Sequence, residues 1–326
     1  MYEALLDPTR ERVSLDTIEY PDMYALFEKH KKSFWTAGEV SFVDDVGHWN
    51  DRLNEDERSF FKHILQFFAA SDYFVAKNCA SNFRDEVSAL EHKFFYDFQA
   101  MMENEHSIVY GNMIKALVPE PEERACMFNA VQTHPFIKRK IDWVLSYMSR
   151  DIPFQDRVVA MACMEGIFFS ASFCTIFWLK HRGLMPGLCQ ANEWISRDES
   201  LHTQAGCLVH RQLMHPSTRT LDIVRSAVAL ECDFVEDALQ GKQLPGLSVD
   251  EVCRHVKYVA DVVLGQLGMP PEYGVEEPFE WMVLMTAPLK ENFFESRVTS
   301  YSRPQLKRLR SSVMTTADIE TILCKI

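Results

Sequence analysis

The chain has 326 residues, of which 47% are hydrophobic and 25% are charged, and this composition is typical of a folded globular protein. Its 47 acidic residues outnumber its 34 basic ones, and the net charge of −13 argues against nucleic acid or an anionic membrane surface as the main partner. With only 12 glycines and 14 prolines, the chain favours long helices.

The nine cysteines are scattered and form no Cys-x-x-Cys pair, so neither a disulfide framework nor a zinc cluster is indicated. The N-terminal segment 1–17 lacks the basic-then-apolar order of a signal peptide, and its early acidic residues are unlike those of a transit peptide. We therefore expect a protein of the reducing cytoplasm.

Two long helices are predicted between Gly47 and Pro119, where Gly111 is the only glycine or proline. A polar helical stretch then runs up to the segment 151–153, which indicates a new helix start. No further proline occurs before His181, so one helix is expected there. The later helices are predicted from about residue 187 to Pro216 and near 219–240 and 249–268.

The most apolar stretch, residues 158–179, contains a single charge, Glu165, and is long enough to span a bilayer. A charge within the span would be costly there, and no other segment is comparably apolar. A helix that is apolar all round is also required at the centre of a large bundle. We therefore predict a buried core helix and no membrane span.

A charge inside an apolar helix must be paired, neutralised or bound to metal. The sequence contains two Glu-x-x-His pairs, Glu103 with His106 and Glu199 with His202. Residues three apart share one helix face, so each pair can bind a common metal centre. A single pair of this kind would more simply be a solvated helix face.

A further acidic residue, Asp72, follows the apolar run 67–71. The order is then carboxylate, Glu-x-x-His, carboxylate, Glu-x-x-His, which is the ligand set of a ferritin-like four-helix bundle with two metal ions. Carboxylates with one imidazole per metal suit iron or manganese, and two divalent cations would cancel four buried negative charges. The predicted ligands are Asp72, Glu103, His106, Glu165, Glu199 and His202.

Tyr110 lies one turn beyond His106 on the same helix face, where its phenol could be oxidised. An ordinary core tyrosine is the alternative. Apolar residues at four-residue spacing from the acidic ligands would keep the site dry and protect a radical, although they too could be plain core residues. These residues are Phe169, Phe173 and Ile195.

Six stretches of the sequence resemble the small, radical-generating subunit of class I ribonucleotide reductase, nearest to its eukaryotic and viral branch. They are SFWTAGEV at 33–40, FFAASD at 67–72, MENEHSIVY at 102–110, MEGIFFS at 164–170, ISRDESLH at 195–202 and NFFESRVTSY at 292–301. The resemblance implies a homodimer with a di-iron centre, oxo-bridged when oxidised, at the six ligands. Manganese is a possible substitute. The centre would react with O2 and oxidise Tyr110 to a stable radical.

The resemblance also implies that the radical passes to a separate large subunit, which reduces ribonucleotides to deoxyribonucleotides. The path would use Trp35, Asp198 and Tyr301, with Asp198 linking the tryptophan to His106. A single ferritin-like di-iron domain is expected over residues 1–290, and a C-terminal tail for docking the large subunit over 291–326. The tail departs from the family in its basic residues and in its final residues, which end in Ile326.

Two alternatives stay open from the residues alone. A ferritin-like iron-storage or di-metal oxidase protein would use the same ligands to oxidise iron. A two-electron oxidase acting on a lipid or small substrate would need a cavity beside the metals.

Overall fold

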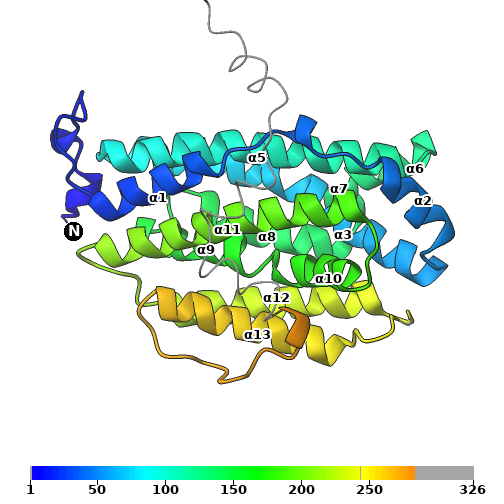
Figure 1. Ribbon diagram of the computed structural model, residues 1–326. Helices are drawn as coiled ribbons and strands as arrows, with labels where there is room; N and C mark the ends of the chain where they lie inside the picture. Colours follow the sequence, from blue (N-terminus) through cyan, green and yellow to red (C-terminus); the bar gives the residue numbers. More distant parts are fainter. Residues whose placement is uncertain (1, 243, 283–326) are drawn as a thin grey trace, which may run out of the picture. The chain divides into compact units, whose positions relative to one another are not determined.

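The computed structural model describes residues 2–242 and 244–282, which form a bundle of long helices lying side by side (Figure 1). The described residues contain no β-strand, and only an isolated bridge joins Leu244 to Leu247. The predicted all-α class is therefore confirmed. The boundary expected at residue 290 and the tail 291–326 lie outside the described residues.

The helices follow the sequence in this order: α1 Pro21–Lys32, α2 Val43–Asp51, α3 Glu55–Asn78, α4 Arg84–Glu86, α5 Leu90–Leu117, α6 Pro121–Phe128, α7 Ala130–Thr133, α8 Pro135–Met148, α9 Phe154–Gly166, α10 Ser170–His181, α11 Pro186–Gln212, α12 Thr220–Leu239 and α13 Val249–Gln266. Short 3₁₀ turns occur at Ala4–Leu6, Pro8–Arg10 and Ala37–Glu39. A π-helical turn, Cys79–Phe83, follows α3.

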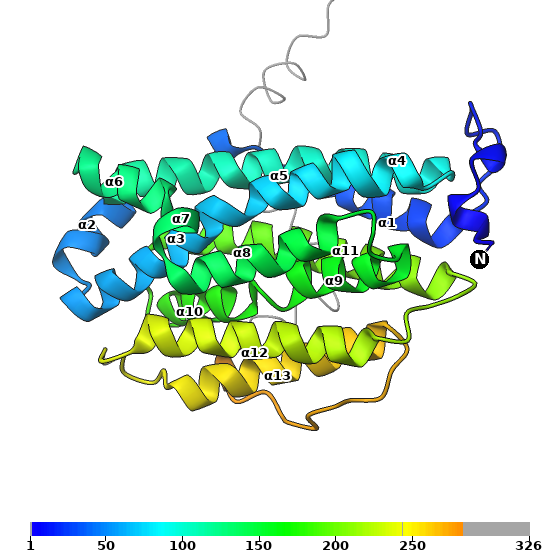
Figure 2. The same cartoon turned by 180° about the vertical axis from the view of Figure 1, so that it is seen from behind.

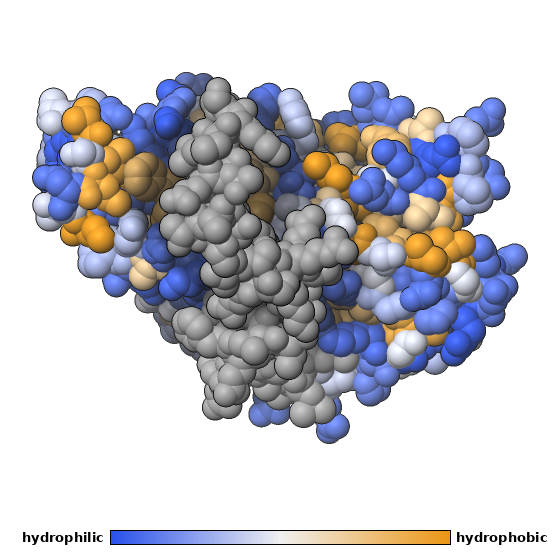
Figure 3. All heavy atoms as spheres, turned by 45° about the horizontal axis from the view of Figure 1, so that its top comes forward, coloured by the Kyte–Doolittle hydropathy of each residue, from blue (hydrophilic) through white to orange (hydrophobic). Residues whose placement is uncertain are grey.

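Four helices form the core: α3 packs against α5, and α9 packs against α11. Helix α1 lies along α5, whereas α12 and α13 form a pair on the opposite side of the bundle, as both Figure 1 and Figure 2 show. This is the predicted ferritin-like core with additional helices. The surface in Figure 3 is mostly hydrophilic, with separate hydrophobic patches.

Helix α3 confirms the first predicted long helix. Asn54 accepts a hydrogen bond from the Glu57 backbone, and the Glu57 side chain accepts one from the Asn54 backbone, each at 2.9 Å. This reciprocal cap fixes the start of the helix. The apolar residues at helical spacing are at most 1% exposed: Phe60, Ile64, Phe67, Phe68 and Val75.

The single helix predicted up to His181 is wrong, because residues 167–169 divide it into α9 and α10. The amides of Ile167 and Phe168 both donate to the Cys163 carbonyl, at 2.8 and 3.2 Å. The Phe168 carbonyl instead accepts a hydrogen bond from Lys140 Nζ at 2.8 Å. A buried lysine from α8 thus satisfies a carbonyl at the break.

The apolar segment Phe154–His181 is the one candidate membrane span among the described residues, and 94% of its most apolar window is buried inside the molecule. Its contacts are with other helices of the bundle, since α9 packs on α11 and α12. This supports the prediction of a core element.

Helix α11 begins where two backbone segments approach closely. The amides of Gly187 and Leu188 donate to the buried Asp45 carboxylate at 2.9 and 2.7 Å. A Cβ atom on Gly187 would lie 2.1 Å from the Ser41 carbonyl oxygen, so only glycine fits at this position. The contact fixes the start of the helix that carries Glu199 and His202.

A fully buried ion pair between Lys140 and Glu231 joins α8 to α12. The Lys140 ammonium also lies over the ring of Phe67 on α3. Glu231→Ala would leave the ammonium without its counter-charge, and we expect a loss of about 3–5 kcal/mol in the free energy of unfolding. Glu231→Gln keeps an oxygen acceptor and is expected to lose less. Denaturant unfolding of the metal-loaded protein measures both, and a loss below about 1 kcal/mol for the alanine variant would contradict the expectation.

Candidate metal centre

The four core helices bring the six predicted ligands together in the interior. They come from α3 (Asp72), α5 (Glu103 and His106), α9 (Glu165) and α11 (Glu199 and His202), and each residue is at most 2% exposed. Their ligand atoms form two groups, within each of which all atoms lie within 4.8 Å of one another. One group is Asp72, Glu103 and His106; the other is Glu103, Glu165, Glu199 and His202.

Each imidazole presents its Nδ1 atom to the same two carboxylates. His106 Nδ1 lies 3.2 Å from Glu103 and 3.1 Å from Glu199. His202 Nδ1 lies 2.9 Å from Glu103 and 3.0 Å from Glu199. Glu103 and Glu199 are therefore placed between the two histidines, where both could help to hold a pair of metal ions.

The buried carboxylates differ in how readily they ionise. Burial raises the pKa of Asp72 and of Glu165 well above its usual range, and neighbouring carboxylates raise both further. Burial would also raise the pKa of Glu199, but the two imidazoles outweigh it and lower this pKa. Four negative charges at this place thus require added positive charge.

The donor set fits a pair of divalent iron or manganese ions. Asp72 Oδ2 and Glu165 Oε2 are buried and accept no hydrogen bond from the described residues. Buried carboxylate oxygens without a partner are costly unless a cation or a proton meets them. Oxygen ligands with one imidazole for each ion match the preference of iron and manganese.

Neighbouring polar groups hold the ligands in place. Gln99 Nε2 donates to Glu165 Oε1 at 2.7 Å, and Ser71 Oγ donates to Asp72 Oδ1 at 3.1 Å. Gln99 lies one turn before Glu103 on the same helix face, and this spacing is the one signal in the sequence that points to it.

A buried histidine outside the ligand set, His30 of α1, lies against His202 with ring centroids 4.9 Å apart. Burial, and then the positive charge of His202, lowers the pKa of His30 to about 3, so its ring is neutral. No pattern in the sequence points to this residue.

Asp198 joins the centre to Trp35, as the family resemblance implies. Trp35 Nε1 donates to Asp198 Oδ2 at 2.7 Å, and the same oxygen lies 3.4 Å from His106 Nε2. The Trp35 ring also stacks on the His106 ring, with centroids 5.7 Å apart and an interplanar angle of 18°. Tyr301, the third predicted transfer residue, lies outside the described residues.

Tyr110 is buried beside the ligands in an aromatic environment. Its ring stacks on Phe68 at 4.4 Å, and Phe68 in turn contacts Phe169 and Phe173 at 5.9 and 5.6 Å. Burial raises the pKa of Tyr110 well above its usual range, and the negative charge of Asp72 adds to this. Ile195 is buried as well.

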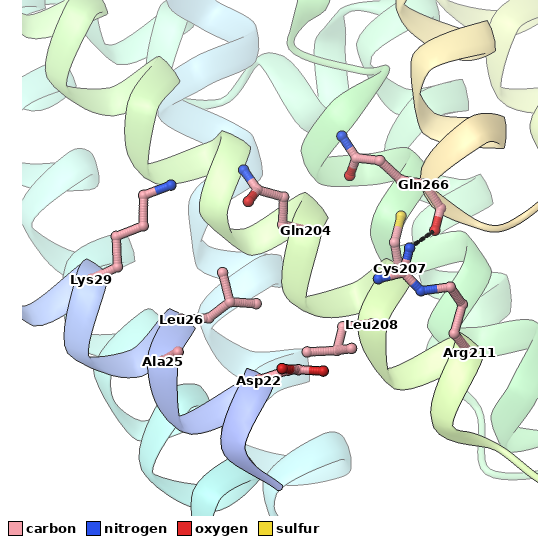
Figure 4. Close-up of a pocket in the computed structure, with 9 residues that line it drawn as sticks. All are labelled: Asp22, Ala25, Leu26, Lys29, Gln204, Cys207, Leu208, Arg211 and Gln266. Atoms are coloured by element: carbon pink, nitrogen blue, oxygen red, sulfur yellow. Dashed lines mark hydrogen bonds between the residues drawn. The ribbon is translucent and has the colours of Figure 1, made fainter. Parts of the chain in front are cut away.

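A surface hollow of about 490 Å³ lies between α1, α11 and α13 (Figure 4). Arg211 of α11 lines it and donates to the Gln266 carbonyl at 2.7 Å. None of the six predicted ligands lines this hollow. It therefore gives no support to the alternative in which a substrate cavity opens onto the metals.

The sequence and the fold are both similar to those of known proteins. Residues 12–278 match the family model "Ribonucleotide reductase, small chain". The protein is 44% identical over 303 residues to a ribonucleoside-diphosphate reductase small chain of Arabidopsis thaliana, covering 92% of this protein and 91% of the plant one. It is 43% identical over 304 residues to the ribonucleoside-diphosphate reductase subunit M2 of Homo sapiens, and the match covers 92% of this protein and 78% of the human one.

Among solved structures, the ribonucleotide reductase Rnr4 homodimer from Saccharomyces cerevisiae superposes with a TM-score of 0.77 at 30% identity, covering 92% of both chains. The family match, the identities and the fold agree over most of the length. This chain belongs to the ribonucleotide reductase small-chain family.

Proposed function

We propose that this small chain of ribonucleoside-diphosphate reductase generates its radical at Tyr110, beside a dimetal centre held by the six buried ligands. The observation that carries the proposal is the burial of one tyrosine next to a carboxylate and histidine cluster, inside an aromatic environment. The relatives support it, because they are reductase small chains and not iron-storage proteins.

When bound, a pair of iron or manganese ions supplies a reaction with dioxygen that removes one electron from a phenol. Tyr110 must then release its hydroxyl proton, since its raised pKa keeps the phenol protonated beforehand. Asp72 is the carboxylate that acts most strongly on Tyr110, so we propose that the proton leaves toward the metal centre.

The aromatic neighbours protect the radical once it has formed. Phe68 covers one face of the Tyr110 ring, and Phe169 and Phe173 lie behind Phe68. None of these side chains offers a hydrogen atom as readily as a thiol or phenol would. They also exclude water and soluble reductants from the site.

Asp198 serves the transfer of the radical toward the large subunit. Although burial raises its pKa, the hydrogen bond from His106 and the charge of Arg197 outweigh burial, so the pKa is lowered and the carboxylate is ionised. It can accept from the Trp35 and His106 N–H groups together. When an electron moves between Trp35 and the centre, a proton can shift along this hydrogen-bonded path. The shift keeps opposite charges from building up at its two ends in the core.

We further propose that the protein forms a homodimer and docks its large subunit through residues 291–326. The yeast neighbour is described as a homodimer, which supports the first part. The docking role rests on the family resemblance, because the tail lies outside the described residues. The cytoplasmic location expected from the cysteines stays a prediction.

Tyr110→Phe removes the phenol and leaves the ligands intact. After loading with ferrous iron and air, we expect the wild type to show a sharp tyrosyl absorption and a radical resonance, and the variant to show neither at the same iron content. Tyr96→Phe is the matched control, since Tyr96 is another buried tyrosine of α5. An undiminished radical in Tyr110→Phe would place the radical elsewhere.

Trp35→Phe removes the indole N–H that donates to Asp198 but keeps an aromatic ring beside His106. We expect the Tyr110 radical to form, while nucleotide reduction with the large subunit falls on the order of 10²-fold or more. Trp194→Phe is the control, because Trp194 packs on Trp35 at 5.3 Å without that hydrogen bond. Equal turnover in the Trp35 variant and this control would remove Trp35 from the path.

A synthetic peptide of residues 320–326 tests the docking role of the tail. It should compete with the full-length protein for the large subunit and lower nucleotide reduction in a dose-dependent way, with the radical content unchanged. A scrambled peptide of the same composition is the control. Equal inhibition by both peptides, or by neither, would contradict docking through this segment.

A further inference from the structure

A second group of metal-ligating side chains lies outside the buried centre. It consists of His63 on α3, His134 at the junction of α7 and α8, and Asp237 on α12, and their ligand atoms lie within 4.8 Å of one another. We propose that these three residues bind a single divalent transition-metal ion of the zinc type, with water completing the coordination. We call this group the His63 site.

The environment of His63 leaves one ring nitrogen free for a metal. Its Nδ1 atom lies 3.1 Å from the Ser59 carbonyl oxygen, which can only accept a hydrogen bond. Nδ1 therefore carries the proton, and the Nε2 lone pair is available. Metal-binding histidines are commonly oriented in this way, by donating the other N–H to a backbone carbonyl.

His134 and Asp237 already have a separation suited to a shared ion. His134 Nε2 lies 3.5 Å from Asp237 Oδ2, which is long for a charged hydrogen bond. Two ligands on a tetrahedral zinc ion, each about 2.0–2.1 Å from the metal, are roughly 3.4 Å apart. A cation between these two atoms thus needs almost no movement of either side chain.

The two histidine rings meet edge to face, and a ring nitrogen of each lies within 4.8 Å of the other and of an Asp237 oxygen. Their centroids are 4.8 Å apart and their planes make an angle of 86°, so the rings are not stacked against each other. Burial and nearby His63 lower the pKa of His134, which keeps its imidazole neutral and able to bind a metal near pH 7. His134 Nδ1 is buried and has no hydrogen-bond partner among the described residues.

The donor chemistry selects the type of ion. Two imidazole nitrogens and one carboxylate oxygen suit zinc and neighbouring transition metals, whereas calcium and magnesium prefer oxygen ligands throughout. Three protein ligands leave a position open to water. The Lys242 charge acts on His134 and opposes a cation, but Lys242 Nζ donates to the Ala238 carbonyl at 2.8 Å.

The His63 site is separate from the buried centre and shares no residue with it. His63 precedes Asp72 by nine positions on α3, which corresponds to about 13 Å along the helix axis. An ion at the His63 site would cross-link three separate segments of the chain, namely α3, the α7–α8 junction and α12. We expect it to stabilise their packing.

The test uses the full-length protein after its buried centre has been loaded with iron. Zinc is then added and measured by calorimetry together with analysis of the zinc and iron contents. The wild type should bind one zinc ion per protomer without losing iron, and its Tm should rise. His134→Ala and Asp237→Asn should weaken zinc binding about 10–100-fold. His215→Ala, which removes an exposed histidine elsewhere, should leave it unchanged.

Asp237→Asn keeps the size of the side chain, so this variant tests the site even where His134→Ala perturbs the helix junction. Zinc-edge X-ray absorption of the wild type should show two imidazole ligands together with oxygen. Three results would each overturn the proposal: zinc uptake matched by iron loss, equal zinc affinity in wild type and Asp237→Asn, or no zinc binding beyond the iron-loaded centre.

Discussion

The mutual repulsion of four buried carboxylates is the constraint on which the rest of this structure depends. Burial raises the pKa of Asp72 and Glu165, and neighbouring carboxylates raise both further. Only bound cations, or protons shared with the two imidazoles, can balance this charge. Because the ligands come from α3, α5, α9 and α11, the same cations that neutralise them would also hold the four core helices in register.

Several features outside the site follow from the need to hold those helices in fixed positions. Asp45 binds the first amides of α11, and the close approach of Ser41 requires Gly187 there. At the end of α9, Lys140 satisfies the carbonyl released at the break. Each contact fixes a helix end, and through that end it fixes the height of the ligands along the helix.

The convergence of the six predicted ligands could be foreseen from the sequence because its signal is local: Glu-x-x-His occupies one helix face, and a lone charge in an apolar helix needs a partner. The break at 167–169 could not be predicted in this way, because the group that satisfies its Phe168 carbonyl is a lysine of another helix. His30 was also missed, since only the packing of α1 brings its ring against His202. The roles of Trp35 and Asp198 came from family resemblance; the structure adds their contact.

The position of Asp198 would let one residue serve both the metal centre and the proposed radical transfer. Asp198 Oδ2 is close enough to His106 Nε2 to orient that imidazole, which leaves Nδ1 directed at Glu103 and Glu199. The same oxygen accepts the Trp35 indole N–H. A change in the charge of His106 would therefore alter the hydrogen bond to Trp35 directly, because both N–H groups share one acceptor oxygen. Electronic events at the centre are in this way coupled to the residue through which the radical would leave.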